Sequence, residues 1–192
     1  SVEVARAFGV PLHVRSAFTW EPGTWVLEED PAMERAIIKG VVPDTSQAKI
    51  TLSGVQDEPG LAAKVFRTLA NALVNVDMIV QNASDDGASA DLTFTVGKAD
   101  LARATEVIGK AQDILEYQEL MSDSNVVKVS VIGVGMRTHA GVATKMFKTL
   151  ADKGINIQVI STSEIKVSVL IAEEYTELAL RSLHTAYDLD EE

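Results

Sequence analysis

The sequence predicts an α+β protein that contains two copies of one β-α-β-β-α unit. Three features indicate this fold: a gapless internal repeat, strand-like stretches of alternating apolar residues, and helix-like stretches with apolar residues four positions apart. The repeat aligns residues 60–82 with residues 141–163 at a constant offset, and nine aligned positions are identical. Such agreement without a gap indicates a duplication.

Each copy begins with an alternating strand that ends in Gly-Val, "KITLSGV" at 49–55 and "KVSVIGV" at 128–134. A loop and a helix follow. In the first copy the apolar stripe of that helix is predicted to contain Leu61, Val65, Leu69 and Leu73.

A second strand, a turn and a third strand come next, and then a second helix, at 100–115 in the first copy and 175–187 in the second. The first copy closes with a further strand, "YQELMS". This order predicts two ferredoxin-like βαββαβ units, each with a four-stranded antiparallel sheet and two helices on one face.

The second copy lacks its closing strand, because its last helix runs into acidic "DLDEE". The strand-like segment "RAIIKGVVPD" at 35–44 has no other partner, so we expect it to complete the second sheet. The first unit is then inserted into a permuted second one, with the first at 45–124 and the second at 33–44 and 125–192. The alternative is that 35–44 is an irregular linker.

Composition excludes several classes of function. The 192 residues include 28 acidic and 17 basic ones, for a net charge of −11, which argues against binding to nucleic acid or anionic membranes. There is no cysteine, no basic leader and no apolar run long enough to span a membrane, so a cytoplasmic location is expected. The three histidines lack metal-ligand spacing, and no catalytic motif is present, so no metal and no catalytic residue are predicted. The chain opens on helix-like "VEVARAF" without an initiator Met, as expected of a fragment.

The loop "QDEPG" before the first helix combines features that suit a small zwitterion. The free amides of a helix start attract a carboxylate, Gly60 permits close approach to the main chain, and Asp57 offers a carboxylate to an ammonium group. The structural alternative is that Asp57 only tightens the turn and Gly60 only relieves a clash.

The second strand of each unit, "VNVDMIVQN" or "INIQVISTS", is expected at a sheet edge, where an apolar and lightly charged strand usually finds a partner.

These residues resemble the ACT-domain regulatory region of the aspartate kinase family. The repeated strand, glycine loop and helix followed by "VNVDMIVQN" is similar to the family's first ACT unit, and "KGINIQVISTSEIKVSVLI" is similar to its second. "GVPLHVRSAFTWEPGTWV" is similar to the last strand and exit linker of the catalytic domain, so residues 1–30 are expected to be its tail. Met33 is placed where a separately translated regulatory (β) subunit would begin.

The resemblance implies an aspartate kinase, which phosphorylates the β-carboxylate of aspartate with ATP on the way to lysine, threonine and methionine. It implies feedback inhibition by threonine and/or lysine, bound where ACT units of two chains meet in a homodimer. Catalysis, ATP and Mg²⁺ would belong to an absent catalytic domain or α subunit, so this chain itself is expected to be non-catalytic and without cofactor.

Carried over position by position, the family's effector contacts form one predicted site and one pseudo-equivalent site. The first comprises Asp57, Gly60, Leu61, Ala62, Val76, Asp77 and Gln81, with Asn156 and Ile157 contributed by a partner chain. The second comprises Thr138, Gly141 and Val142, and it lacks an acidic counterpart of Asp57. Ser84 matches a position where substitutions relieve feedback.

Two other functions remain open: an amino-acid-sensing module of another enzyme, and a dimerisation module that binds no ligand.

Overall fold

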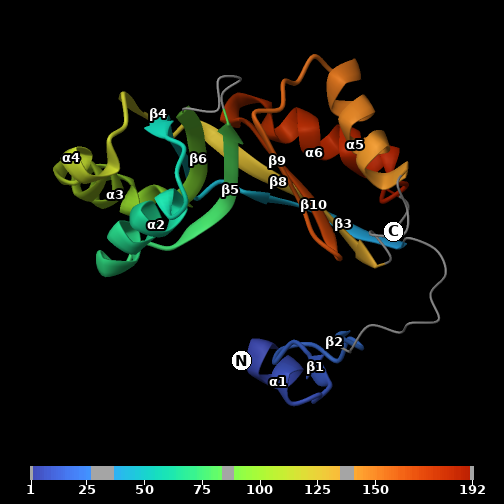
Figure 1. Cartoon of the computed structure of the whole chain (residues 1–192). Helices are drawn as coiled ribbons and strands as arrows, with labels where there is room; N and C mark the ends of the chain where they lie inside the picture. The colour runs from blue at the N-terminus through green and yellow to red at the C-terminus, as the bar shows by residue number, and fades with distance from the viewer. Residues whose placement is uncertain (1, 27–36, 84–88, 135–140, 191–192) are drawn as a thin grey trace. The chain divides into compact units, whose positions relative to one another are not determined.

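The computed structural model describes residues 2–26, 37–83, 89–134 and 141–190, and the chain divides into two compact units (Figure 1). The N-terminal unit is Ser1–Arg35 and the main body is Ala36–Glu192. Helix α1 (Val2–Ala7) confirms the helix expected at the opening of the chain, and a hairpin of β1 (Leu12–Val14) and β2 (Thr24–Val26) follows it. The His13 ring stacks on Trp25 across this hairpin, with 4.0 Å between the ring centroids.

The first repeat of the main body is a four-stranded antiparallel sheet in the order β5-β6-β4-β7. Its elements are β4 (Gln47–Gln56), α2 (Leu61–Asn71), β5 (Val76–Ala83), β6 (Ser89–Gly97), the 3-10 turn η1 (Lys98–Asp100), α3 (Leu101–Lys110), α4 (Gln112–Leu115) and β7 (Glu119–Asp123). Helices α2 and α3 cover one face of the sheet (Figure 1). Alternate residues of β4 and β6, such as Leu52 and Phe94, meet Leu69 and Ile108 of the helices in a core that is fully buried.

The second repeat has the sheet order β3-β8-β10-β9. Its elements are β3 (Ile37–Asp44), β8 (Val126–Val134), α5 (Gly141–Asp152), β9 (Val159–Thr162), β10 (Lys166–Ala172), the 3-10 turn η3 (Glu173–Tyr175) and α6 (Thr176–Ala186). Strand β3 pairs with β8 from Ile37 opposite Val134 to Asp44 opposite Lys128, so the upstream segment completes this sheet. The inserted and permuted arrangement predicted from the sequence is confirmed, and 37–44 is not an irregular linker.

The predicted helix boundaries differ from the structure at two places. Helix α2 ends at Asn71, so Leu73 does not extend its buried stripe; Leu73 has φ 58° and is 81% exposed. The second helix of this repeat is not continuous from 100 to 115. The backbone leaves the helical region at Ala111 (φ −98°, ψ 12°). The short helix α4 follows and brings Leu115 into the core.

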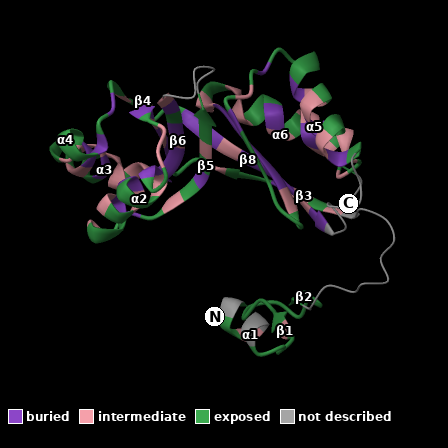
Figure 2. Cartoon of the chain, in the orientation of Figure 1, coloured by how far each residue is buried: buried purple, intermediate pink, exposed green. Residues whose placement is uncertain are grey.

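The helix-free faces of the two sheets meet within the main body, while the helices lie on the outer faces (Figures 1 and 2). A small buried cluster lies between the sheets; it consists of Met78 from β5, Val126 from β8, Val159 from β9 and Leu170 from β10, with Val80 packed against it. Both second strands, β5 and β9, are edge strands, as expected. The cluster brings them close to the contact between the repeats.

Candidate functional site

The loop between β4 and α2 leaves the start of the helix without a side-chain cap in the described structure. Gly60 is the N-cap residue, with φ 101° and ψ −4°, and no side chain accepts a hydrogen bond from the first amides of α2. No acidic residue lies in the first helical turn either. The Leu61 amide already donates to the Glu58 carbonyl at 3.1 Å, so the donors that suit an anionic group are the next amides of α2.

The structure brings together the two predicted polar residues of this loop region. Gln81 Nε2 on β5 donates a hydrogen bond to Asp57 Oδ1 in the loop, at 3.2 Å. Lys64, one turn into α2, forms an ion pair with Glu58 of the same loop. The loop is therefore tied to both the edge strand and the helix, with the Asp57 carboxylate half-buried beside the helix start.

The other predicted residues of the first loop face different directions. The side chain of Leu61 is 4% exposed and belongs to the core, Ala62 is half-buried, and Val76 packs against the same core. Asp77 lies apart from Asp57. The pairing register of β5 shifts between Val76 and Ile79, so Asp77 at the shift and Gln81 beyond it face different parts of the molecule. The Asp77 carboxylate forms an ion pair with Lys128 on β8.

In the second repeat, Asn156 is exposed in the segment before β9, and Ile157 packs against the second core. Gly141 is the first residue of α5 and is exposed. Val142 is buried, and its carbonyl accepts a 2.6 Å hydrogen bond from the Tyr187 hydroxyl. Thr138, Ser84 and Met33 lie outside the described residues.

Tyr187 gives the second loop region surroundings unlike those of the first. Burial raises the pKa of Tyr187 to about 12, despite a backbone hydrogen bond that acts in the opposite direction. The Lys145 ammonium lies 5.2 Å from the centre of the Tyr187 ring. Lys64, the identical residue of the first repeat, instead reaches the acidic loop.

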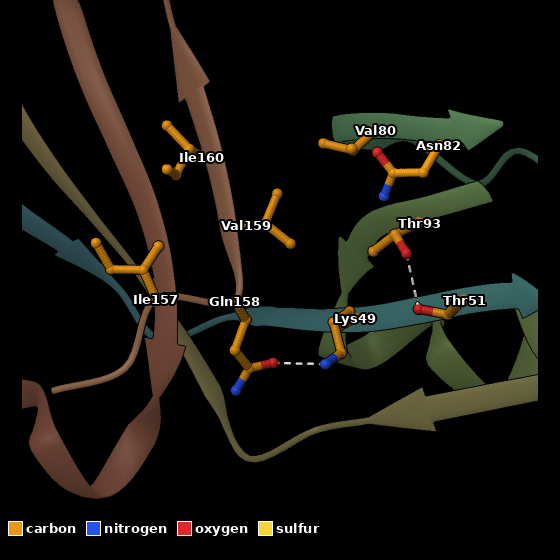
Figure 3. A pocket seen from close by; sticks show the side chains of 9 residues that line it. All are labelled: Lys49, Thr51, Val80, Asn82, Thr93, Ile157, Gln158, Val159 and Ile160. Atoms are coloured by element: carbon orange, nitrogen blue, oxygen red, sulfur yellow. Dashed lines mark hydrogen bonds between the residues drawn. The ribbon is translucent and has the colours of Figure 1, made fainter. Parts of the chain in front are cut away.

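A cleft of about 360 Å³ opens between the helix-free faces of the two sheets (Figure 3). Its lining residues are Lys49, Thr51, Val80, Asn82, Thr93, Ile157, Gln158, Val159 and Ile160. Lys49 Nζ donates to Gln158 Oε1 at 2.5 Å, and the Thr51 and Thr93 hydroxyls are 2.9 Å apart. Of the predicted effector residues that the structure describes, Ile157 alone lines the cleft, so the cleft is distinct from the loop before α2.

Sequence reasoning missed the polar residues that join the two repeats, above all Lys49, Lys128 and Gln158. A signal for them existed: Lys49 and Lys128 open the first strand of each copy at equivalent positions. The apolar alternation that predicts these strands does not indicate what the two matching lysines face.

None of the described helices combines the length and the apolar character needed to cross a bilayer. Nor do three or more His, Cys, Asp or Glu residues of the described segments gather where they could hold a metal ion.

Comparison with known proteins identifies the family. A model of the ACT domain matches residues 50–112 and again residues 129–187. The aspartokinase of Pseudomonas aeruginosa is 48% identical over 192 residues, which cover 99% of this chain and 46% of the relative. The chain thus spans about half the length of the curated relatives it matches.

Two solved structures share the fold at high sequence identity. A structure of aspartokinase alpha and beta subunits is 47% identical with a TM-score of 0.74, covering 79% of this chain and 99% of that one. The ligand-free regulatory subunit of aspartate kinase from Thermus thermophilus is 39% identical with a TM-score of 0.74, covering 78% of this chain and 98% of that one. From its duplicated units, its permuted sheet and these relatives, the chain belongs to the aspartokinase family and carries the family's pair of ACT domains.

Proposed function

We propose that this chain is the effector-binding regulatory region of an aspartokinase, and that threonine and/or lysine binds it to mediate feedback inhibition. The observation that carries the proposal is the pairing of Asp57 with Gln81 beside an uncapped helix start. The amides at the start of α2 suit the α-carboxylate of a free amino acid, and the Asp57 carboxylate suits its ammonium group.

A second chain would complete the pocket. Ile79 on the edge strand β5 and Ile160 on the edge strand β9 are equivalent in the repeat, and both remain about half exposed at 49% and 45%. Pairing such edges between two chains covers apolar surface and satisfies unpaired main-chain groups. In the resulting homodimer, Asn156 and Ile157 of one chain would approach the Asp57 loop of the other.

Catalysis would belong to a domain or α subunit outside this chain, which would hold aspartate, ATP and Mg²⁺. The relatives are about twice as long as this chain, and one solved relative contains both alpha and beta subunits. Phe18 and Trp20 of the N-terminal unit are 97% and 95% exposed, as expected of residues that a neighbouring domain covers. We therefore assign residues 1–30 to the tail of that domain and its linker. A cytoplasmic location remains a prediction.

Isothermal titration of the chain with threonine and with lysine tests the proposal. Binding of at least one of them is expected, and Asp57→Ala should abolish it because the ammonium group loses its carboxylate. Asp113→Ala, which removes an exposed carboxylate on α4, is the matched control and should bind as the parent does. Undiminished binding by Asp57→Ala would remove Asp57 from the site.

A dimerisation module that binds no ligand is the competing function, and the exposed edges of β5 and β9 are compatible with it. Thermal-shift screening of the twenty amino acids separates the two functions. A chain that dimerises by light scattering, yet whose melting temperature responds to no amino acid, would be such a module.

A further inference from the structure

The two repeats face each other through a pair of contacts that the duplication makes equivalent. Lys49 on β4 and Lys128 on β8 occupy the same position of the repeat, and so do their partners Gln158 and Asp77. Each lysine reaches across to the other repeat. One contact is therefore a hydrogen bond to a neutral amide, and the other is an ion pair.

The ion pair is the more enclosed of the two contacts. The side chain of Lys128 is only 12% exposed, and its ammonium also lies 3.4 Å from the Asp44 carboxylate at the end of β3. Burial alone would lower the pKa of Lys128, but Asp77 and Asp44 outweigh it and hold the pKa above its ordinary value. Removal of the carboxylate partners would leave this enclosed ammonium without a counter-charge, which strongly destabilises the folded state.

Strand β5 links this ion pair to the predicted pocket. Asp77 near its beginning holds Lys128 of the second repeat, and Gln81 near its end holds Asp57 of the loop. As an edge strand, β5 has a neighbour in the sheet on one side only, namely β6. The contact with Lys128 supplies an anchor that the sheet does not.

We infer that Lys128 is a positioning residue for effector binding: through Asp77 it fixes the edge strand β5, and with it Gln81 of the pocket, relative to the second repeat. Asp77 then acts as the anchor of this strand rather than as a direct contact of the effector. The effector part of this inference rests on the proposed function, whereas the positioning part does not.

Spin labels test the positioning part without any effector. The chain contains no cysteine, so Ala83→Cys at the exposed end of β5 and Arg181→Cys on α6 place one label on the edge strand and one on the second repeat, and dilution with unlabelled chain isolates the intrachain distance. Lys128→Met should broaden or shift the distance distribution. Lys49→Met, the matched control, and Lys128→Arg, the conservative replacement, should leave it unchanged.

Asp77→Asn should broaden the distribution in the same way, and it keeps the test valid if Lys128→Met does not fold. A distribution for both variants identical to that of the parent would overturn the inference. Equal broadening by Lys49→Met would also overturn it, because the effect would then not be specific to the ion pair.

Titration with threonine and lysine tests the effector part. Lys128→Met should bind the effector about fivefold or more weakly, because fewer molecules hold β5 in the competent position. Lys49→Met and Lys128→Arg should bind as the parent does, and melting temperatures of all variants separate weak binding from loss of fold. Parental affinity in a folded Lys128→Met chain would refute this part. If the parent itself binds neither amino acid, the proposed function fails, and the spin-label distances still decide the positioning role.

Discussion

Lys98 and Glu173 occupy equivalent positions in the two repeats, and their side chains form an ion pair at 2.9 Å. Each belongs to a 3-10 turn that follows the third strand of its repeat, and the residues before the turns, Gly97 and Ala172, have nearly the same backbone angles. The repeats also exchange equivalent contacts, Lys49 with Gln158 and Lys128 with Asp77, so an approximate twofold axis relates them, and two equivalent positions touch where that axis passes. The duplication has placed opposite charges at that point.

Reversing one of these charges should destabilise the chain. Lys98→Glu places two carboxylates on the axis, and both side chains are about one third exposed, so we expect a loss of about 0.5–1 kcal/mol of unfolding free energy. Urea denaturation measures it. The double variant with Glu173→Lys restores opposite charges and should recover most of the loss.

The control is Lys110→Glu, which breaks the more exposed ion pair with Glu106 inside α3. Within the described ranges, its ion pair is with Glu106 of the same helix and not with the other repeat, so the charge swap with Glu106→Lys should recover less. Failure of the Lys98–Glu173 swap to recover stability would show that the pair contributes nothing to the contact between the repeats.

Asp44 should make the stability of the main body depend on acid pH. Burial opposes its charged form, but hydrogen bonds from Ser46 and Gln47, helped by Lys128, outweigh this and lower the pKa of Asp44 from 3.8 to about 2. Because the folded pKa lies below the unfolded one, the stabilisation is complete above about pH 4 and is lost as the pH falls towards 2.

Asp44→Asn tests this dependence through urea denaturation at neutral pH and at about pH 2.5. The variant should lose about 1 kcal/mol at neutral pH, after allowance for solvent screening of a side chain that is 32% exposed, and only about 0.3 kcal/mol near pH 2.5, where about two thirds of the stabilisation is already lost. Asp113→Asn, on exposed α4, is the control. An equal loss at both pH values would contradict the role of the charge.

The order of elements and the permuted strand could be predicted from the sequence because both depend on apolar periodicity and on the count of strands that a sheet needs. The edge positions of β5 and β9 followed from the same topology. The direction in which the Asp77 side chain points could not be predicted. It depends on a register shift in β5, and the alternation of apolar and polar residues does not indicate that shift. The contacts between the repeats were missed for a similar reason: periodicity identifies the buried face of each sheet but not what faces the other side.

Gly60 and Gly141 are identical in the repeat but differ in conformation, so alanine should affect them differently. Gly60 has φ 101°, which disfavours any side chain, although no described atom lies within 4 Å of an added Cβ. Gly60→Ala should therefore cost about 1–2 kcal/mol through backbone strain alone. Gly141 begins α5 without a positive φ, and Gly141→Ala should be neutral or stabilise by up to about 1 kcal/mol.

Thermal and urea unfolding of the two variants measure this difference. Equal effects would show that the two glycines share one backbone conformation in solution. The comparison also bears on the pocket: a Gly60→Ala chain that stays folded but loses effector binding would indicate that the main chain at Gly60 is approached closely by the ligand.

Leu73 occupies the position that Gly154 fills in the second repeat, and replacing it with glycine should stabilise the chain. Both residues follow the first helix of their repeat with a left-handed backbone, at φ 58° and 71°. The same pair of hydrogen bonds ends each helix, from Leu73 N to Ala70 O and from Val74 N to Leu69 O in the first repeat. Leu73 is 81% exposed, so little burial is lost with its side chain.

Left-handed backbone costs a leucine about 1–2 kcal/mol and glycine little, although glycine also gains freedom in the unfolded chain. Leu73→Gly should therefore raise the unfolding free energy by about 0.5–1 kcal/mol, measured by urea denaturation. The reciprocal Gly154→Leu should lower it by about 1–2 kcal/mol. A neutral Leu73→Gly together with a destabilising Gly154→Leu would mean that the contacts of the Leu73 side chain offset its backbone strain. Leu73→Ala keeps the strain but removes those contacts, so in that case it would destabilise the chain.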